Sequence, residues 1–173
     1  MNNKGYLTAD TSSKADEYYT PENVVAAILP HIPEKVNTIW CPFDGGGSNY
    51  VKVLRKAGYN VISSHINEGK DFFEYEPQSY DCIISNPPFS KKDEILKRLS
   101  ELGKPYALLL PLPSLQGAKR FPYLIGSQAL IFDKRINFYN DEACQNQVKG
   151  VAFASIYVCK DFLEKDLIFE KLE

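Results

Sequence analysis

The chain lacks the features that mark several large classes of protein. No apolar run approaches the length of a membrane-spanning helix, and the first five residues are polar and lack the apolar core of a secretion signal. The four cysteines form no CxxC pair, and only two histidines are present, so neither a disulfide framework nor a zinc cluster is indicated. We therefore expect a cytoplasmic protein without a membrane partner or a bound metal. Its cysteines, Cys41, Cys82, Cys144 and Cys159, should be free thiols, three of them within buried strands.

A strong excess of positive charge is also missing. The net charge of −2 argues against a nonspecific nucleic-acid binder, which usually carries a basic surface. It leaves room for a local basic rim, although solvated surface charges are the alternative. The basic residues of the middle and later chain are Lys91, Lys92, Lys97, Arg98, Lys119, Arg120, Lys134, Arg135 and Lys149.

What is present suits one globular domain. The 173 residues are 44% hydrophobic and 13% aromatic, which is enough for a full core, and no linker or repeat divides them. We therefore expect a single domain over residues 1–173, with residues 1–17 as a loose polar segment. No separate target-recognition domain is expected.

Apolar patterns alternate between strands and helices along the chain. Thr20, Pro21 and Glu22 predict a helix start, with a hydroxyl cap, proline at the first helical position and an acid in the first turn. This alternation predicts an α/β fold with a doubly wound, mostly parallel sheet. Strands are expected at 38–41, 59–62, 81–84, 106–110, 129–132 and 151–158, with helices near 22–29, 50–57 and 94–102; residues 163–172 have no clear assignment.

Asn86, Pro87, Pro88 and Phe89 follow the apolar run 82–85 and form the most informative motif. An asparagine side chain and a proline carbonyl both offer acceptors, and the phenyl ring can stack on a flat heterocycle. Such a group can hold a planar base by its amino group. A plain turn after a strand is the alternative.

A second loop, from Asp44 to Ser48, leaves the first strand and contains three consecutive glycines. Loops at the carboxyl ends of parallel strands open onto one rim, where ligands bind. The glycines do not complete G-x-G-x-x-G, no G-K-[ST] follows, and His65 stands where a ribose-binding acid would be expected. These departures disfavour NAD and ATP but leave an adenosine ligand without a phosphate chain.

With these motifs, the chain over roughly residues 16–160 resembles the S-adenosylmethionine-dependent amino methyltransferases, and most closely the small phage-type adenine-N6 DNA methyltransferases. Their fold is Rossmann-like, with an antiparallel closing strand, here similar to residues 151–157. The resemblance implies a bacterial or phage-infected cell, and Asn86, Pro87, Pro88 and Phe89 as the catalytic tetrapeptide. It implies S-adenosyl-L-methionine as cofactor, bound by Tyr19, Thr20, Pro21, Cys41, Pro42, Asp44, Gly45, Gly47, His65, Asp71, Phe72 and Asn86.

Two positions depart from the family's pattern. Cys41 stands where an acid usually binds the methionine ammonium group, so Asp44 is expected to take over that role. His65 stands where an acid grips the ribose hydroxyls, which leaves Glu68 as a replacement.

The expected reaction is methylation of the N6 amino group of adenine in DNA. The same chemistry on RNA or on a protein glutamine remains an alternative, as does a non-catalytic binding domain, which the departures at Cys41 and His65 would favour. Only segments 114–128 and 139–150 have room to read a target, where Asn140, Gln145, Asn146 and Gln147 could contact base edges or form a solvated loop. A homodimer or a partner subunit could supply the remaining recognition.

Overall fold

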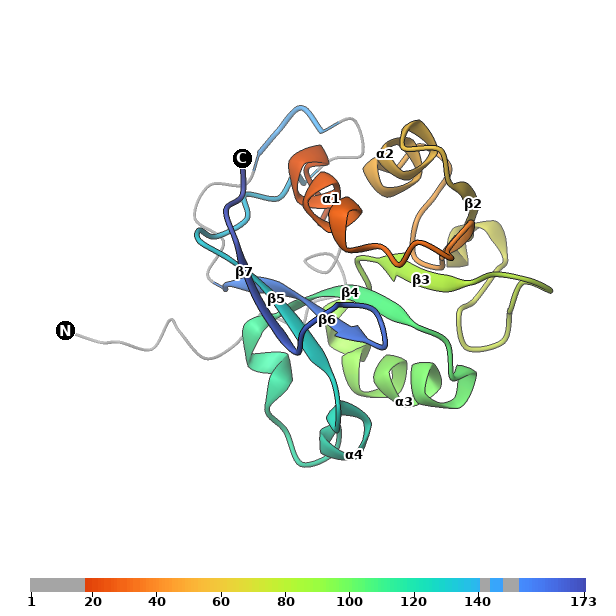
Figure 1. The fold of residues 1–173 in the computed structure, drawn as a ribbon. Coiled ribbons are helices and arrows are strands. Elements are labelled where there is room, and N and C mark those ends of the chain that lie inside the picture. The colour runs from red at the N-terminus through yellow and green to blue at the C-terminus, as the bar shows by residue number, and fades with distance from the viewer. Residues whose placement is uncertain (1–17, 141–143, 148–152) are drawn as a thin grey trace.

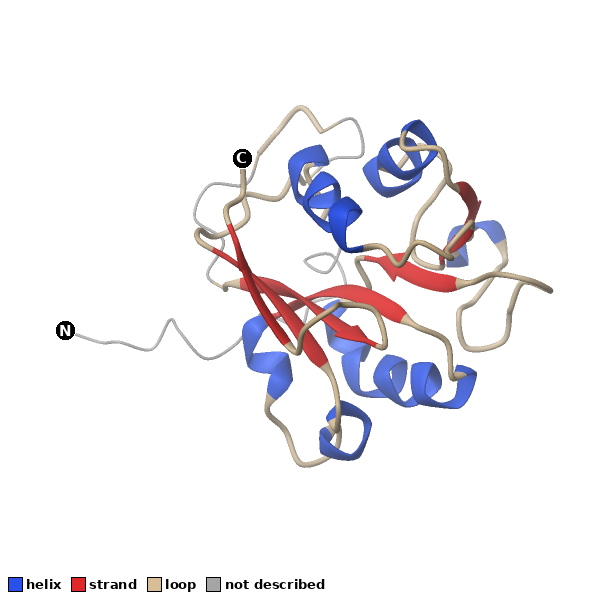
Figure 2. Ribbon diagram, viewed as in Figure 1, coloured by secondary structure: helices blue, strands red, loops and turns tan. Residues whose placement is uncertain are grey.

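The computed structural model describes residues 18–140, 144–147 and 153–173, and seven strands in this part of the chain form one sheet. The strands follow the order β2-β1-β3-β4-β6-β5-β7. Figure 1 shows the sheet with its helices, and Figure 2 colours helices and strands differently. Six strands run parallel, and β6 runs antiparallel to both of its neighbours. The strands are β1 (Thr38–Cys41), β2 (Asn60–Ser63), β3 (Cys82–Ser85), β4 (Tyr106–Pro111), β5 (Gln128–Phe132), β6 (Ser155–Lys160) and β7 (Leu167–Glu170).

Helices cover both faces of the sheet. Helices α1 (Glu22–Ile28) and α2 (Asn49–Lys56) lie on one face, and α3 (Lys92–Leu102) and α4 (Phe121–Leu124) lie on the other (Figure 1). Short 3-10 helices η1 (Leu29–His31), η2 (Ile66–Glu68), η3 (Phe89–Lys91) and η4 (Leu112–Leu115) follow strands or helices. The predicted doubly wound α/β fold with an antiparallel closing strand is confirmed. No helix in the described ranges is long and apolar enough to span a bilayer.

Two hydrophobic cores, one on each face, hold these layers together. Strand β4 is buried along its whole length: Leu109 points to the core under α1 and α2, while Leu108 and Leu110 point to the core under α3. A strand buried on both faces needs a continuous apolar run, which residues 106–111 provide. The thiols of Cys41, Cys82 and Cys159 are buried and free within strands, as predicted, and burial raises the pKa of Cys82 to about 12.

Several expected boundaries were wrong by a few residues. Strands β2 and β3 each begin one residue later than predicted, and Asp81 lies before β3 because its carboxylate accepts hydrogen bonds from the backbone nitrogens of Asn37 and Thr38, both at 2.8 Å. Strand β6 begins at Ser155, whereas Val151 and Ala152 of the predicted closing strand lie outside the described residues, as do residues 1–17 and Lys149. Strand β7 was not predicted.

The helix cap predicted at Thr20 is also wrong. Pro21, not Thr20, occupies the N-cap position of α1, and no side chain caps this helix. The reason is tertiary: backbone hydrogen bonds of 2.9 Å in both directions join Tyr19 to Tyr139 and fix the chain just before the helix. The Thr20 hydroxyl therefore does not cap the helix.

Candidate functional site

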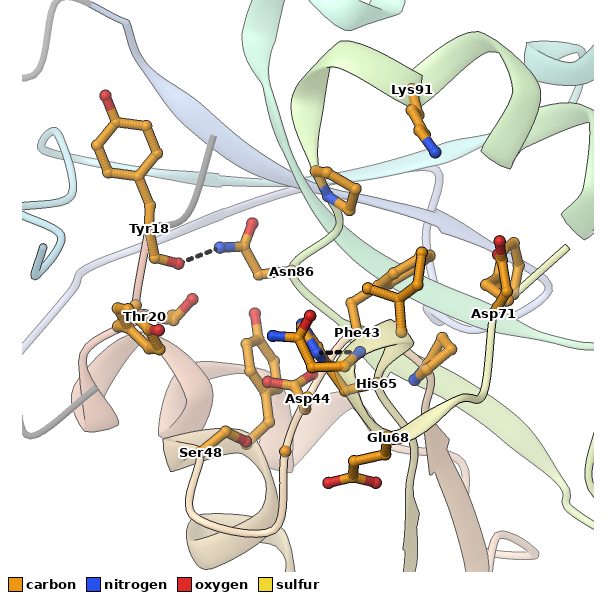
Figure 3. Close-up of a pocket in the computed structure, with 18 of the residues that line it drawn as sticks. Tyr18, Thr20, Phe43, Asp44, Ser48, His65, Glu68, Asp71, Asn86 and Lys91 are labelled. Carbon is orange, nitrogen blue, oxygen red and sulfur yellow. Dashed lines mark hydrogen bonds between the residues drawn. The ribbon is translucent and has the colours of Figure 1, made fainter. Parts of the chain in front are cut away.

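A cavity of about 660 Å³ opens at the carboxyl ends of β1 and β3. The two loops predicted to share one rim both contribute to its wall, together with residues before α1 and after β2 (Figure 3). A volume of this size suits a ligand of cofactor dimensions. The residues lining it are Tyr18, Tyr19, Thr20, Pro42, Phe43, Asp44, Gly45, Ser48, Asn49, Tyr50, His65, Ile66, Asn67, Glu68, Asp71, Phe72, Phe73, Asn86, Pro88, Ser90, Lys91 and Cys144.

Asp44 is the buried acid of this cavity, with 8% of its surface exposed. The Ser85 hydroxyl donates a hydrogen bond to Asp44 Oδ2, and an antiparallel bridge joins Asp44 to Ser64 at the end of β2. Burial raises the pKa of Asp44 to about 6, against the opposing effect of hydrogen bonds from Ser85 and Ser48. The carboxylate is therefore largely ionised at neutral pH, and a buried anion of this kind favours a cationic partner.

Polar groups from α2 and from the chain before α1 adjoin Asp44. Ser48 caps α2 by accepting a hydrogen bond of 3.2 Å from the Val51 nitrogen, and Asn49 Nδ2 donates to the Thr20 carbonyl at 2.9 Å. The Thr20 hydroxyl oxygen is buried on the cavity wall and interacts with the Tyr50 hydroxyl. A buried hydroxyl on a cavity wall is suited to a polar ligand.

His65 and Glu68 border the cavity after β2. His65 Nδ1 accepts a hydrogen bond of 3.2 Å from the Asn67 nitrogen and so caps η2. Glu68 is exposed, and its carboxylate lies beside the glycine loop, 4.0 Å from where a Cβ atom on Gly45 would stand. The histidine is thus held in a local turn, while the Glu68 carboxylate is accessible at the cavity edge.

The other end of the cavity is aromatic. Asp71 Oδ1 accepts a hydrogen bond of 3.0 Å from the Phe73 nitrogen, which folds this segment into a tight turn. Phe72 is 3% exposed and packs against Phe43, with 4.9 Å between ring centroids. Lys91 Nζ lies 5.6 Å from the centroid of the Phe73 ring. Figure 3 shows Asp71 on the opposite side of the cavity from Thr20 and Ser48.

Asn86 is the polar side chain of the tetrapeptide that reaches the cavity. Its Nδ2 donates a hydrogen bond of 2.8 Å to the backbone carbonyl of Tyr18 (Figure 3). Its Oδ1 is buried, and nothing in the described part of the chain hydrogen-bonds to it. Leaving a buried acceptor unpaired costs about 1 to 3 kcal/mol, so a ligand that donates an N–H or O–H to Oδ1 would recover that cost.

Phe89 and Pro87 do not line the cavity. Phe89 is 6% exposed and packs against Tyr18, with centroids 6.3 Å apart and planes 24° apart, and edge-on against Phe153 at 5.4 Å. Pro87 is buried within its loop. The face of Phe89 that was predicted to stack on a base is therefore covered by neighbouring rings in this structure.

The structure brings most of the predicted cofactor residues together around one cavity. Cys41, Pro21 and Gly47 are absent from it, and Cys41 is fully buried in the core under α1 and α2, where burial raises the pKa of its thiol. Tyr18 and Asn49 line the cavity but were not predicted, whereas Lys91, which also lines it, was among the residues expected to form a basic rim. A capping serine after the glycines would have indicated Ser48, whereas no local signal marks Tyr18.

Comparison with solved structures finds a related fold in the subunit of a known methyltransferase. No protein-family model matches the chain, and no curated protein matches it by sequence. The methyltransferase subunit of a type I restriction-modification system from Streptococcus thermophilus aligns with a TM-score of 0.52 and 15% identity over 90% of this chain. This chain spans about half of that subunit, 47% of its length. A candidate methyltransferase from Thermoplasma acidophilum aligns with a TM-score of 0.38 and 16% identity, over 88% of this chain and 67% of that one.

Proposed function

We propose that this protein transfers a methyl group from S-adenosyl-L-methionine to the exocyclic N6 amino group of adenine in DNA. The observation that carries this proposal is the Asn86 side chain, whose Oδ1 is buried beside the cavity and has no hydrogen-bond partner among the residues that the structure describes. An amide turned in this way presents an acceptor only, and an amino group is a donor that fits it. The shared methyltransferase fold supports the same reading.

The cavity residues fit the proposed cofactor. Asp44 supplies an anion for the ammonium group, and the hydroxyls of Thr20 and Ser48 line the same end. Phe72 and Asp71 suit a flat adenine ring at the opposite end. Glu68, beside Gly45, is the accessible acid for the ribose hydroxyls, in place of His65. When bound, S-adenosylmethionine supplies a methyl group on a positively charged sulfur.

The tetrapeptide's part in the reaction is to orient the acceptor. Asn86 Oδ1 would accept one N–H bond of the amino group, and the Pro87 carbonyl would accept the other if its loop moved toward the cavity. Together these bonds favour a pyramidal nitrogen with its lone pair directed out of the ring plane. Such catalysis consists of positioning and of stabilising the positive charge that develops on nitrogen. Phe89 would support this loop from beneath, and it would stack on a flipped-out base only if Tyr18 moved aside.

DNA is the acceptor that we propose, and the charge around the cavity offers modest support. Lys91 lines the cavity and is exposed. Arg120 is held by Asp93 at 2.5 Å, and Arg98 lies near Glu76 at 3.7 Å, so these arginines already have acidic partners. A cationic rim built chiefly on Lys91 suits weak contact with a phosphate backbone, and a homodimer or partner subunit would add further contacts.

The test is methyl transfer with labelled S-adenosylmethionine. Purified protein would be incubated separately with single-stranded DNA, duplex DNA, RNA and a glutamine-containing protein mixture, and labelled nucleosides or residues would be identified by mass spectrometry. N6-methyl-2′-deoxyadenosine from DNA is the expected product. Label in RNA or glutamine would reassign the acceptor. No transfer together with no cofactor binding by calorimetry would favour the non-catalytic alternative.

A further inference from the structure

Residues 18–20, here called the strap, cross between the two loops of the cavity and are held from three sides. Asn86 donates to the Tyr18 carbonyl at 2.8 Å, and Asn49 donates to the Thr20 carbonyl at 2.9 Å. Between these two contacts, Tyr19 forms its paired backbone hydrogen bonds with Tyr139. Asn86 lies in the tetrapeptide loop, and Asn49 is the first residue of α2, directly after the glycine loop, so the strap is a shared anchor for both sides of the cavity.

The strap decides which way the Asn86 amide faces. A backbone carbonyl oxygen can only accept a hydrogen bond, so the amide nitrogen of Asn86 must face Tyr18 and its Oδ1 must face away. Without this contact the amide could turn over and present an N–H donor to the acceptor site. An amino group could then no longer be held by that position.

The Tyr18 ring keeps this carbonyl in place. It packs against three phenylalanines, with ring centroids 6.3 Å from Phe89, 5.5 Å from Phe138 and 5.8 Å from Phe153. The ring touches both hydrophobic cores of the protein. A ring packed this closely fixes the backbone that carries it.

We propose that Tyr18 is a positioning residue for methyl transfer: through its packed ring and its backbone carbonyl it holds Asn86 with Oδ1 toward the amino group of the acceptor. This inference rests on the proposed function. It adds a division of labour within the strap, in which the Tyr18 contact serves the acceptor and the Thr20 contact with Asn49 serves the cofactor end.

The first experiment compares Tyr18→Ala, Tyr18→Phe and Asn49→Ala in methyl transfer to an adenine-containing DNA oligonucleotide. Tyr18→Ala should lower kcat by about 10- to 100-fold, because small displacements of a positioning group carry costs of this size, and should change the Kd for S-adenosylmethionine by less than about threefold. Tyr18→Phe keeps the ring and should restore kcat to within about threefold. Asn49→Ala should show the reverse pattern, with a weakened cofactor Kd and a smaller change in kcat.

A second variant separates positioning from folding. In the Asn86→Asp variant, the new carboxyl group can donate a hydrogen bond to the Tyr18 carbonyl only when it is protonated. With saturating cofactor, the ratio of its kcat to that of the wild type should therefore rise at least severalfold as the pH falls from 8 to 5.5. A flat ratio would overturn the proposal, as would a Tyr18→Ala protein with unchanged kcat or with equal losses of kcat and cofactor binding.

A third measurement does not depend on activity. The side-chain amide signal of Asn86, identified by its loss in Asn86→Ala, should exchange its protons slowly in the wild type and at least tenfold faster in Tyr18→Ala. If the wild type transfers no methyl group to any acceptor, the proposed function fails, while this exchange rate still decides whether Tyr18 fixes the amide. Equal exchange rates in both proteins would reject that role.

Discussion

The two loops that form the cavity differ in how well their polar groups are satisfied. In the glycine loop, Asp44 receives hydrogen bonds from its neighbours and Ser48 caps a helix. In the tetrapeptide loop, Asn86 Oδ1 has no partner within the described residues, and the 3-10 helix that follows has no side-chain cap. Both loops leave parallel strands of the same sheet, so the difference comes from their side chains and not from the fold.

This difference matches two kinds of task. A loop with a buried but hydrogen-bonded acid is prepared to hold a charged ligand that stays in place. A loop with one unsatisfied acceptor is prepared for a group that arrives with its own donor. The following predictions test this contrast, from the largest expected effect to the smallest.

Removing the unsatisfied acceptor should have the largest effect. Asn86→Ala should lower the methyl-transfer rate by about 10²- to 10³-fold, the usual cost of losing one preorganised group that acts in the transition state. Calorimetry should find cofactor affinity within about threefold of the wild type, because the cofactor end is formed by the other loop. Asn60→Ala, at an exposed site on β2, is the matched control. A parallel loss of cofactor binding and rate would contradict the separate roles of the two loops.

Neutralising the buried acid should instead weaken cofactor binding. Asp44→Asn should raise the cofactor Kd by about 10- to 100-fold, since hydrogen bonds to charged groups contribute about 1.5 to 3 kcal/mol. Wild-type affinity should also fall as the pH falls through about 6, where Asp44 gains a proton, whereas the variant should lack this step. A titration series from pH 5 to 8 measures both effects. An identical pH dependence in the two proteins would remove Asp44 from the ammonium site.

The same acid should make the unliganded protein less stable at higher pH. Its pKa of about 6 lies above the ordinary value of 3.8, so the folded state binds the proton more tightly than the unfolded state does. The stability this provides is present at low pH and is lost as the pH rises through 6. Relative to Asp44→Asn, the wild type should lose about 2 to 3 kcal/mol between pH 4 and pH 8. Urea unfolding measures this difference. If the free energies of unfolding of the two proteins changed equally between pH 4 and pH 8, the raised pKa of Asp44 would be contradicted.

The smallest effect is expected from the helix cap in the glycine loop. Ser48→Ala should destabilise the protein by about 1 kcal/mol, because the Val51 nitrogen loses its side-chain acceptor. Ser48→Thr keeps a hydroxyl at that place and should recover most of the loss in thermal unfolding. If Ser48→Ala unfolds at the wild-type temperature, the cap contributes nothing to holding this loop.

Sequence patterns predicted the fold well where local chemistry and packing agree. The run 106–111 is apolar throughout because both faces of β4 are buried, and Gly103 ends α3 in a left-handed conformation that suits glycine. Strand β7 could not be seen, since it is four residues long and exposes Leu167 and Phe169 to 50% and 73%. Nothing in its pattern separates it from a loop.

The site was predictable in part, for a similar reason. Loops at the ends of parallel strands meet at one rim, so Asp44 and Asn86 could be placed together before any coordinates were known. Tyr18 could not be placed, because its contact with Asn86 spans 68 residues and uses a backbone carbonyl that every residue possesses. The Thr20 cap was mispredicted for the same reason: a contact with residue 139 outweighed a local preference.

The hydrogen bond from Ser85 to Asp44 has a consequence for the order of events at this site. Ser85 is the last residue of β3 and directly precedes Asn86. The hydrogen-bond partner of Asp44, the acid proposed to bind the cofactor, is therefore the neighbour in sequence of the residue proposed to bind the acceptor. Any change in the protonation of Asp44 alters the partner of Ser85 and reaches the tetrapeptide through the backbone. Thermodynamic linkage then requires that each ligand change the affinity for the other by the same factor, and we expect equilibrium binding of cofactor and acceptor to be cooperative.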